Sequence, residues 1–205
     1  MKKLIIALLL FSVVACKNKE VEKDSEPGLM ESVQKVNKLN KAADSLKEYE
    51  KQIEKLKAMK PVSNEVFKEI LIEEIGGLKR SSYNAGTASM VGLSSAEAKY
   101  DGPNSENIKI SILDGAGESG SALIALTHMT IAMDIESIEG TKTKKTEIFD
   151  GIRYLTENDS SPDSHTSATM TFIYNNRFQI SLEATKMSLE DLKVFAKNLD
   201  LSKLH

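Results

Sequence analysis

Residues 166–184, TSATMTFIYNNRFQISLEA, contain two alternating apolar and polar runs that meet at a pair of asparagines. A two-residue turn at these asparagines would place Phe172 and Phe178 on opposite faces of the hairpin. A three-residue turn, over residues 175–177, would bring every large apolar side chain to one face. Its pairs would be Tyr174 with Phe178, Phe172 with Ile180, and Met170 with Leu182. Because register follows the face that is buried, the sequence predicts the three-residue turn and a sheet with one apolar face.

The same alternation predicts further strands at residues 94–100, 107–113, 141–149 and 152–157. In the second of these strands, Ile108, Ile110 and Ile112 lie on one side and polar residues lie on the other. Asp150-Gly151, between the last two strands, is typical of a type I′ hairpin turn, whose two central residues need positive φ. Strands that are half apolar and half polar are typical of antiparallel sheets with one solvated face.

Helical periodicity occurs at residues 29–60, 65–75, 121–133 and 189–199. Gly76-Gly77 is expected to end the second helix, and Ser188 is expected to cap the last one. Runs of strands interrupted by helices, without a repeated strand–helix–strand unit, indicate an α+β fold. We therefore expect an antiparallel β-sheet flanked by helices over residues 61–204, preceded by a long amphipathic N-terminal helix.

The N-terminus, MKKLIIALLLFSVVAC, has two lysines followed by an apolar run that is too short to span a bilayer. It ends in VVAC at Cys16, the single cysteine of the chain. This layout resembles the signal peptide and lipobox of bacterial lipoproteins. The resemblance implies that residues 1–15 are removed, and that Cys16 carries diacylglycerol and an amide-linked acyl chain such as palmitate. Lys17 stands where an aspartate retains such proteins in the inner membrane, so the resemblance favours the outer membrane of the cell envelope.

Residues 16–28 contain the lipid anchor and a polar stretch with charges of both signs, which predicts a flexible tether. Residues 29–60 contain no Gly or Pro, and their apolar residues recur at intervals of mostly three and four, which predicts an amphipathic helix of roughly 45 Å. Two interpretations fit this stripe: a helix that packs on or projects from its own domain, or a coiled coil with a second copy or a protein partner. The residues expected to contact a partner helix are Val36, Leu39, Leu46, Ile53 and Leu56.

The C-terminal part of the chain has a second resemblance. Three of its segments resemble a family of uncharacterised bacterial lipoproteins: GLKR at residues 77–80, RF at residues 177–178, and MSLEDLKVFAKNLDL at residues 187–201. The order of strands and helices is similar to the PsbP-like fold, a sheet flanked by helices that occurs in small binding and accessory proteins. These resemblances imply a fold and no activity.

Residues 114–120, DGAGESG, place Gly115, Gly117 and Gly120 in the spacing of a dinucleotide-binding loop. That motif requires a buried parallel strand before the loop and a second parallel strand after the helix. The strand before this loop is half polar, and hairpin signals follow the helix, so we expect a flexible connection from strand to helix. An open alternative is an anion or small ligand that contacts the three glycines and Ser121 at the helix N-terminus.

Few residues of the chain point to catalytic chemistry. The histidines lack metal-ligand spacing, and His128, in an apolar helix, is expected to be structural. No serine stands in the nucleophile-elbow pattern, and a net charge of −3 without a basic stripe argues against nucleic acid. Four methionines are expected to lie in an adaptable core, with an apolar pocket as the alternative: Met129, Met133, Met170 and Met187. We expect no enzyme activity, no cofactor and no metal.

The function that these features favour is a non-catalytic binding or scaffolding module anchored in the cell envelope. Its expected partners are the membrane, through the lipid on Cys16, and a protein or a second copy, through residues 29–60. A first alternative is a carrier of a small apolar ligand or lipid in a cavity under the sheet. A second alternative is a nucleotide-using enzyme that acts through the loop at residues 115–120.

Overall fold

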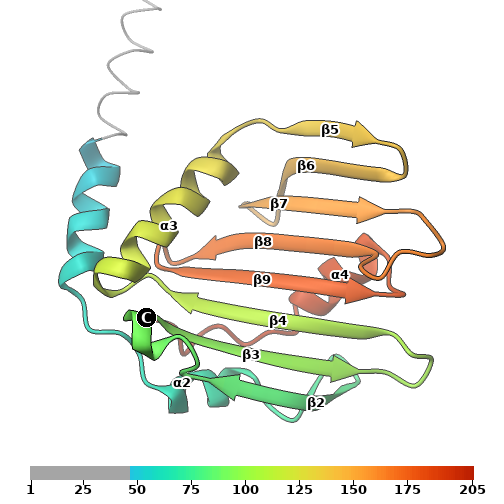
Figure 1. The fold of residues 1–205 in the computed structure, drawn as a ribbon, viewed down its shortest axis with the longest axis horizontal. Helices are drawn as coiled ribbons and strands as arrows, with labels where there is room; N and C mark the ends of the chain where they lie inside the picture. Colours follow the sequence, from blue (N-terminus) through green and yellow to red (C-terminus); the bar gives the residue numbers. More distant parts are fainter. Residues whose placement is uncertain (1–46) are drawn as a thin grey trace, which may run out of the picture. The chain divides into compact units, whose positions relative to one another are not determined.

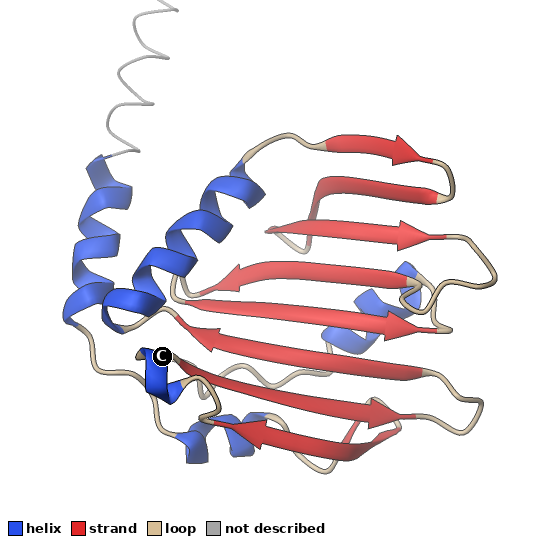
Figure 2. Cartoon of the chain, viewed as in Figure 1, coloured by secondary structure: helices blue, strands red, loops and turns tan. Residues whose placement is uncertain are grey.

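The computed structural model describes residues 47–205 of the chain. They form one antiparallel sheet of nine strands with helices packed against it, so the expected α+β class is confirmed (Figure 1; Figure 2). The strands are β1 (Glu74–Ile75), β2 (Leu78–Ala85), β3 (Ser94–Asp101), β4 (Asn107–Asp114), β5 (Glu136–Glu139), β6 (Lys142–Phe149), β7 (Ile152–Asp159), β8 (Ala168–Tyr174) and β9 (Phe178–Thr185). Their order across the sheet is β1-β2-β3-β4-β9-β8-β7-β6-β5.

The helices are residues 47–58, α2 (Asn64–Ile70), α3 (Gly117–Ala132) and α4 (Leu189–Ala196), with a short 3-10 turn, η1 (Ser89–Val91). Of the long helix expected over residues 29–60, the part from residue 47 is described, and it belongs to the same compact unit as the sheet. The signal peptide, the tether and the first part of that helix lie outside the described residues. Among the helices of residues 47–205, none has the length and apolar character needed to cross a membrane.

The centre of the sheet joins two runs of hairpins. Strands β1 to β4 form the first run, and strands β5 to β9 form the second. α3 carries the chain from β4 to the far edge strand β5, as Figure 1 shows. The second run then returns to the centre, where β9 pairs with β4 and Ile110 lies opposite Leu182. The central pairing therefore depends on segments that are distant in the sequence.

The β8–β9 hairpin has the register that burial of one apolar face predicts. The pairs are Tyr174 with Phe178, Phe172 with Ile180, and Met170 with Leu182. Asn175 and Asn176 take positive φ angles of 50° and 53°, and the amide of Arg177 donates to the carbonyl of Tyr174 at 3.1 Å. Asparagine adopts this left-handed conformation more readily than most residues. The three-residue turn is therefore confirmed, and so is the type I′ turn at Asp150-Gly151, whose φ angles are 50° and 78°.

The helix predicted over residues 65–75 is wrong in its second half. α2 ends at Ile70, and the chain then enters strand β1, which pairs with β2. Gly76-Gly77, with φ angles of 58° and 82°, forms the turn of this hairpin instead of a helix end. The guanidinium of Arg80 donates to the carbonyl of Leu71, directly after the helix. Bonds from a neighbouring strand thus replace those that a continuing helix would have made.

One face of the sheet is apolar, and α2 and α4 cover it. The largest fully buried side chains of the strands are Tyr100, Ile108, Ile110, Ile112, Met170, Phe178 and Ile180. Phe67 of α2 and Leu192 of α4 belong to the same buried cluster. Burial raises the pKa of Tyr100 to about 12. Ser188 caps α4 as predicted, because its hydroxyl oxygen accepts a hydrogen bond of 3.1 Å from the amide of Asp191.

The opposite face of the sheet is polar. Lys109 and Glu183, on the adjacent strands β4 and β9, form an ion pair of 2.8 Å there. α3 crosses one end of this face, at the left of Figure 1, with helix 47–58 beside it, whereas α4 lies behind the sheet. Nε of Arg153, on β7, donates to the carbonyl of Ile131 in α3 at 2.7 Å and holds the helix in place. The helices therefore form two separate layers, one on each side of the sheet.

Candidate functional site

The glycine loop connects β4 to α3, as expected, but the helix begins earlier than predicted. α3 starts at Gly117, not at Ser121, and Ala116 stands at its N-cap position without a side-chain cap. Gly117 has a φ of 81°, a conformation that residues with a side chain rarely adopt. Ser121 is fully buried, and its hydroxyl donates to the carbonyl of Glu118 at 2.9 Å. The Ser121 hydroxyl is therefore already used inside the helix.

Gly115 and Gly120 lie where the chain packs too closely for a side chain. A Cβ atom on Gly115 would come within 2.4 Å of a side-chain carbon of Ile124 and within 2.6 Å of the carbonyl oxygen of Arg177. A Cβ atom on Gly120 would come within 2.6 Å of the carbonyl oxygen of Asp114. These separations are far below van der Waals contact. The glycine spacing therefore has a packing explanation, because the start of α3 lies directly against the end of β4.

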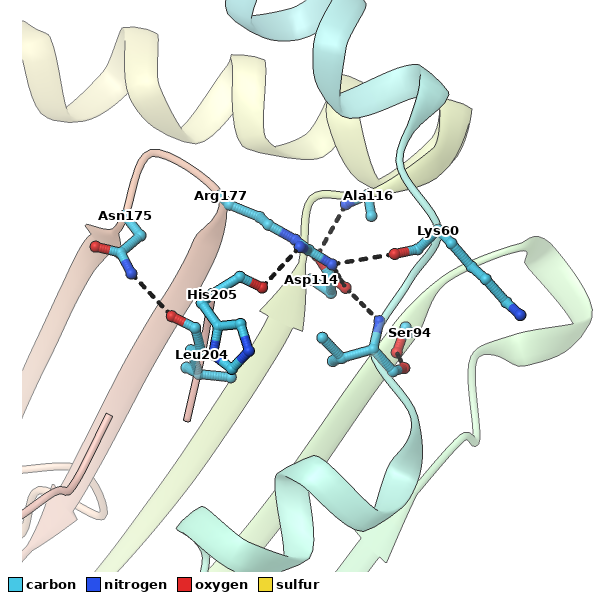
Figure 3. Close-up of polar contacts among 9 residues, drawn as sticks. Lys60, Ser94, Asp114, Ala116, Asn175, Arg177, Leu204 and His205 are labelled. Atoms are coloured by element: carbon cyan, nitrogen blue, oxygen red, sulfur yellow. Dashed lines mark hydrogen bonds and ion pairs between the residues drawn. The ribbon is translucent and has the colours of Figure 1, made fainter. Parts of the chain in front are cut away.

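Asp114, the last residue of β4, is fully buried and forms an ion pair with Arg177. The guanidinium lies side by side with the carboxylate, with Nε 2.7 Å from Oδ1 and Nη2 2.8 Å from Oδ2 (Figure 3). The amide of Ala116 donates to Oδ1 at 2.9 Å, and the amide of Val62 donates to Oδ2 at 2.8 Å. Each carboxylate oxygen thus accepts two hydrogen bonds, so the buried charge is well satisfied.

Arg177 joins further parts of the chain to this ion pair. Its Nη1 donates to the carbonyl of His205 at 3.0 Å, and its Nη2 donates to the carbonyl of Lys60 at 3.2 Å. Asn175, from the same turn, donates to the carbonyl of Leu204 at 2.8 Å (Figure 3). One buried pair therefore ties together the linker after helix 47–58, the end of β4, the β8–β9 turn and the C-terminal residues.

The Asp114 carboxylate lies at the start of α3, where a dinucleotide-binding loop would receive a phosphate. The carboxylate accepts a hydrogen bond from the amide of Ala116, the N-cap residue, and so places a negative charge at the positive end of the helix dipole. An anionic ligand would find the amide of Ala116 already bound by Asp114 and would meet the carboxylate of Glu118 in the first turn. The contacts therefore favour a structural role for the three loop glycines over contact with an anion or a nucleotide.

Sequence reasoning selected the glycines but missed Asp114 and Arg177. The two residues are 63 positions apart, and no local pattern pairs them. Each nevertheless has an apolar setting, because Asp114 follows Ile110 and Ile112 on the apolar side of its strand, and Arg177 stands beside Phe178. Charges at such positions are expected to be buried only when they are paired, and this is the signal that could have found them.

The residues expected to contact a partner helix lie partly within the described structure. Val36, Leu39 and Leu46 lie outside the described residues, as does Cys16, the residue predicted to carry the lipid. Leu56 is fully buried, and Ile53 is partly buried. Leu56 is therefore covered within the described structure, and the choice between a helix on its own domain and a coiled coil stays a prediction for the segment 29–60.

His128 of α3 contacts helix 47–58. Its ring centre lies 4.7 Å from that of Tyr49, with the two planes inclined by 35°. Burial lowers the pKa of His128 and raises the pKa of Tyr49, so both side chains are neutral at pH 7. The tilted contact between the two rings packs His128 against helix 47–58.

Acidification is expected to weaken the packing of His128. Unfolding returns its pKa from a lowered value to about 6.5, so the unfolded chain binds the proton more tightly than the folded one. The contribution of neutral His128 to stability is therefore present above that pH and lost as the pH falls below it. The thermal midpoint, followed by circular dichroism, should fall more between about pH 7.5 and about pH 5.5 in the wild type than in His128→Gln. His165→Gln, in a polar loop, should keep the wild-type dependence, and equal slopes in all three chains would contradict the prediction.

α3 exposes an apolar stripe on the side away from the sheet. Leu126 and Met129 of α3 form this stripe together with Met133, the residue directly after the helix, and the three side chains are 62%, 61% and 55% exposed. Ile124 and Ile131, elsewhere on the helix, are buried. The expectation that Met129 and Met133 lie in the core is therefore wrong, because periodicity alone does not show that α3 is apolar on more than one side. Exposed apolar patches on a folded domain mark surfaces that contact other molecules.

Within residues 47–205, no group of three or more His, Cys, Asp or Glu side chains is placed to hold a metal ion. The features of this part of the chain that bear on function are therefore a buried ion pair under the glycine loop, the stacked Tyr49 and His128 rings, and the exposed stripe of α3. Comparison of the chain with known protein families, with characterised proteins and with solved structures finds no match.

Proposed function

We propose that this protein is a non-catalytic lipoprotein of the bacterial cell envelope that holds a protein partner against α3. The sequence supports the anchor through the lipobox at Cys16. The observation that carries the binding function is the exposed stripe of α3, formed by Leu126, Met129 and Met133.

The stripe suits an amphipathic helix of a partner protein. Side chains spaced three and four residues apart form a ridge that fits between the side chains of a second helix. The two methionines are flexible and can adapt to an irregular partner surface. The side chain of α3 that is charged at pH 7 is Glu118, in its first turn, because the pKa of His128 is lowered by burial. Covering the stripe would therefore desolvate little charge.

Site-specific crosslinking in the native envelope tests this surface. A photoreactive residue at position 126 or 129 is expected to capture the same partner, whereas one at position 194 should not. Val194 is a matched control because it is 63% exposed but belongs to α4, on the other side of the sheet. Leu126→Asp/Met129→Asp should abolish capture from a neighbouring position, Ala122, whereas Val194→Asp should leave it unchanged. Equal capture at positions 126, 129 and 194 would exclude α3 as the docking surface. Capture from position 122 that survives the double substitution would exclude it as well.

The proposed lipid anchor at Cys16 is tested by mass spectrometry and by membrane fractionation. Mass spectrometry of the native protein should find a chain that begins at Cys16 and carries a thioether-linked diacylglycerol and an amide-linked acyl chain. Cys16→Ser should move the protein from the membrane fraction to the soluble fraction, because two or more acyl chains are needed for stable anchoring. Density separation of the two membranes should place the wild type in the outer one. An intact Met1 with a free thiol would remove the lipoprotein assignment.

The carrier alternative predicted a cavity under the sheet. The face covered by α2 and α4 is filled by fully buried side chains, of which Tyr100, Phe67 and Phe178 are the largest. A carrier function would therefore need a hollow at the surface of the domain in place of a cavity between the sheet and these two helices.

A further inference from the structure

A hollow of about 330 Å³ lies between helix 47–58 and α3. Its walls carry four polar side chains that are uncharged at pH 7, Tyr49, Gln52, His128 and Asn176. The hydroxyl of Tyr49 is buried, and among the buried side-chain nitrogen and oxygen atoms of residues 47–205 it is the one without a hydrogen-bond partner. An unpaired buried hydroxyl is unfavourable. Gln52 and His128 are partly exposed in the same walls and Asn176 is exposed, so these three side chains can form hydrogen bonds with a bound group.

A second hollow, of about 310 Å³, adjoins the first, and the two share His128 and Asn176. Its remaining walls are mainly aliphatic, with Ile131, Ala132, Ile152 and Ile173. Arg153 also lines it, but its guanidinium is already bound to the carbonyl of Ile131 and to the carboxylate of Asp134. The second hollow therefore offers an apolar surface whose one cationic side chain is already paired.

We infer that the two hollows form one binding site for a single-chain amphiphile whose uncharged head bears hydroxyl groups. The aliphatic chain lies along the isoleucines of the second hollow, and the head forms hydrogen bonds with Gln52, His128 and Asn176 in the first. Apolar walls with a few converging polar groups are the usual form of small-molecule sites.

The charges that line the hollows favour an uncharged head. Arg153 is paired with Asp134, so an anionic head would have to displace that carboxylate. A cationic head would find one acidic side chain, the exposed Glu48 at the edge of the first hollow. The stripe of α3 formed by Leu126, Met129 and Met133 does not line either hollow, so this site goes beyond the proposed function.

The test uses the full chain from residue 16 with Cys16→Ser, which removes the acyl chains, and octyl glucoside below its micelle concentration as the probe. Nuclear magnetic resonance should show saturable shifts of the His128 ring and of the Ile173 and Asn176 signals. Glucose lacks the aliphatic chain, and octyl sulfate carries an anionic head. Both are expected to bind at least about tenfold more weakly.

Two substitutions separate binding in the hollows from adsorption to the surface. Ile173→Asp puts a charge in the aliphatic half, and Asn176→Gly removes a head contact while tolerating the φ of 53° at that position. Each is expected to weaken octyl glucoside binding about tenfold, whereas Ile148→Asp, at a 68% exposed residue outside both hollows, should not. The site would be overturned if octyl glucoside caused no saturable shift, or if the shifts were confined to Leu126 and Met129. It would also be overturned if glucose or octyl sulfate bound as tightly as octyl glucoside, or if both variants bound it as tightly as the wild type. The crosslinking experiment on α3 is independent, so failure of one proposal leaves the other intact.

Discussion

Replacing Arg177 by methionine is expected to lower the free energy of unfolding by about 3–5 kcal/mol, as when one partner of a buried ion pair is removed. The substitution leaves the Asp114 carboxylate buried, with the amides of Ala116 and Val62 as its remaining donors. It also removes the donors to two backbone carbonyls, one in the linker after helix 47–58 and one at the C-terminal residue. Urea-induced unfolding, followed by circular dichroism, measures the change.

Lys109→Met is the matched control for this substitution. Lys109 and Glu183 also form a close ion pair, of 2.8 Å, but their side chains are 37% and 44% exposed. Solvent screens such pairs, so the expected loss is below about 1 kcal/mol. Asp114→Asn/Arg177→Met should be less destabilising than the sum of its single substitutions, because no unpaired charge then stays buried. A loss for Arg177→Met as small as that for Lys109→Met would show that the ion pair does not hold these segments together.

Gly120→Ala is expected to destabilise the fold by about 1–3 kcal/mol, as overpacking of a close contact usually does. This sign is opposite to that of helix propensity, which favours Ala over Gly inside a helix by about 1 kcal/mol. The reason is the separation of 2.6 Å between a Cβ on Gly120 and the carbonyl oxygen of Asp114, which is backbone and has little freedom to move. Thermal and urea unfolding of the two chains measure the difference.

Ala122→Gly, at an exposed position of the same helix, is the control for Gly120→Ala. It should lower stability by about 1 kcal/mol, in accordance with ordinary helix propensity. Stabilisation by Gly120→Ala would contradict the packing explanation of the glycine loop. The nucleotide alternative is tested separately by calorimetric titration of the wild type with NAD, for which no binding heat is expected. Saturable binding that Gly120→Ala abolishes at unchanged stability would restore that alternative.

Local patterns were sufficient to predict several elements of the fold. The register of the β8–β9 hairpin follows from placing Phe172 and Phe178 on one face, and the structure has that register. The dipeptide Asp150-Gly151 was sufficient to predict the type I′ turn, because both central residues of that turn need positive φ and Asp-Gly adopts positive φ readily. The cap at Ser188 depends on residues within one helical turn. In each case the deciding contacts join residues that are close in sequence.

Other features depended on contacts that the sequence pattern does not contain. Residues 71–75 continue a helical pattern, yet they leave the helix because β2 offers strand pairing and Arg80 binds the carbonyl of Leu71. α3 begins at Gly117, ahead of its apolar periodicity, because its first turn packs against the end of β4. Met129 and Met133 share the helical period of buried residues, but the position of α3 at one end of the polar face leaves them exposed.

The sequence by itself determined the antiparallel sheet with one buried face, its central hairpin register and the turns that close the hairpins, because alternation and turn chemistry act over a few residues. The resemblance of its N-terminus to a lipoprotein signal, with Cys16 as the single cysteine, stays a prediction. Only the tertiary structure decided that a loop with the glycine spacing of a nucleotide site lies over a buried ion pair, because Asp114 and Arg177 come together from positions 63 residues apart. Only the tertiary structure likewise decided which side of α3 is exposed, since a helix that is apolar all round can be oriented only by the surface that it packs against.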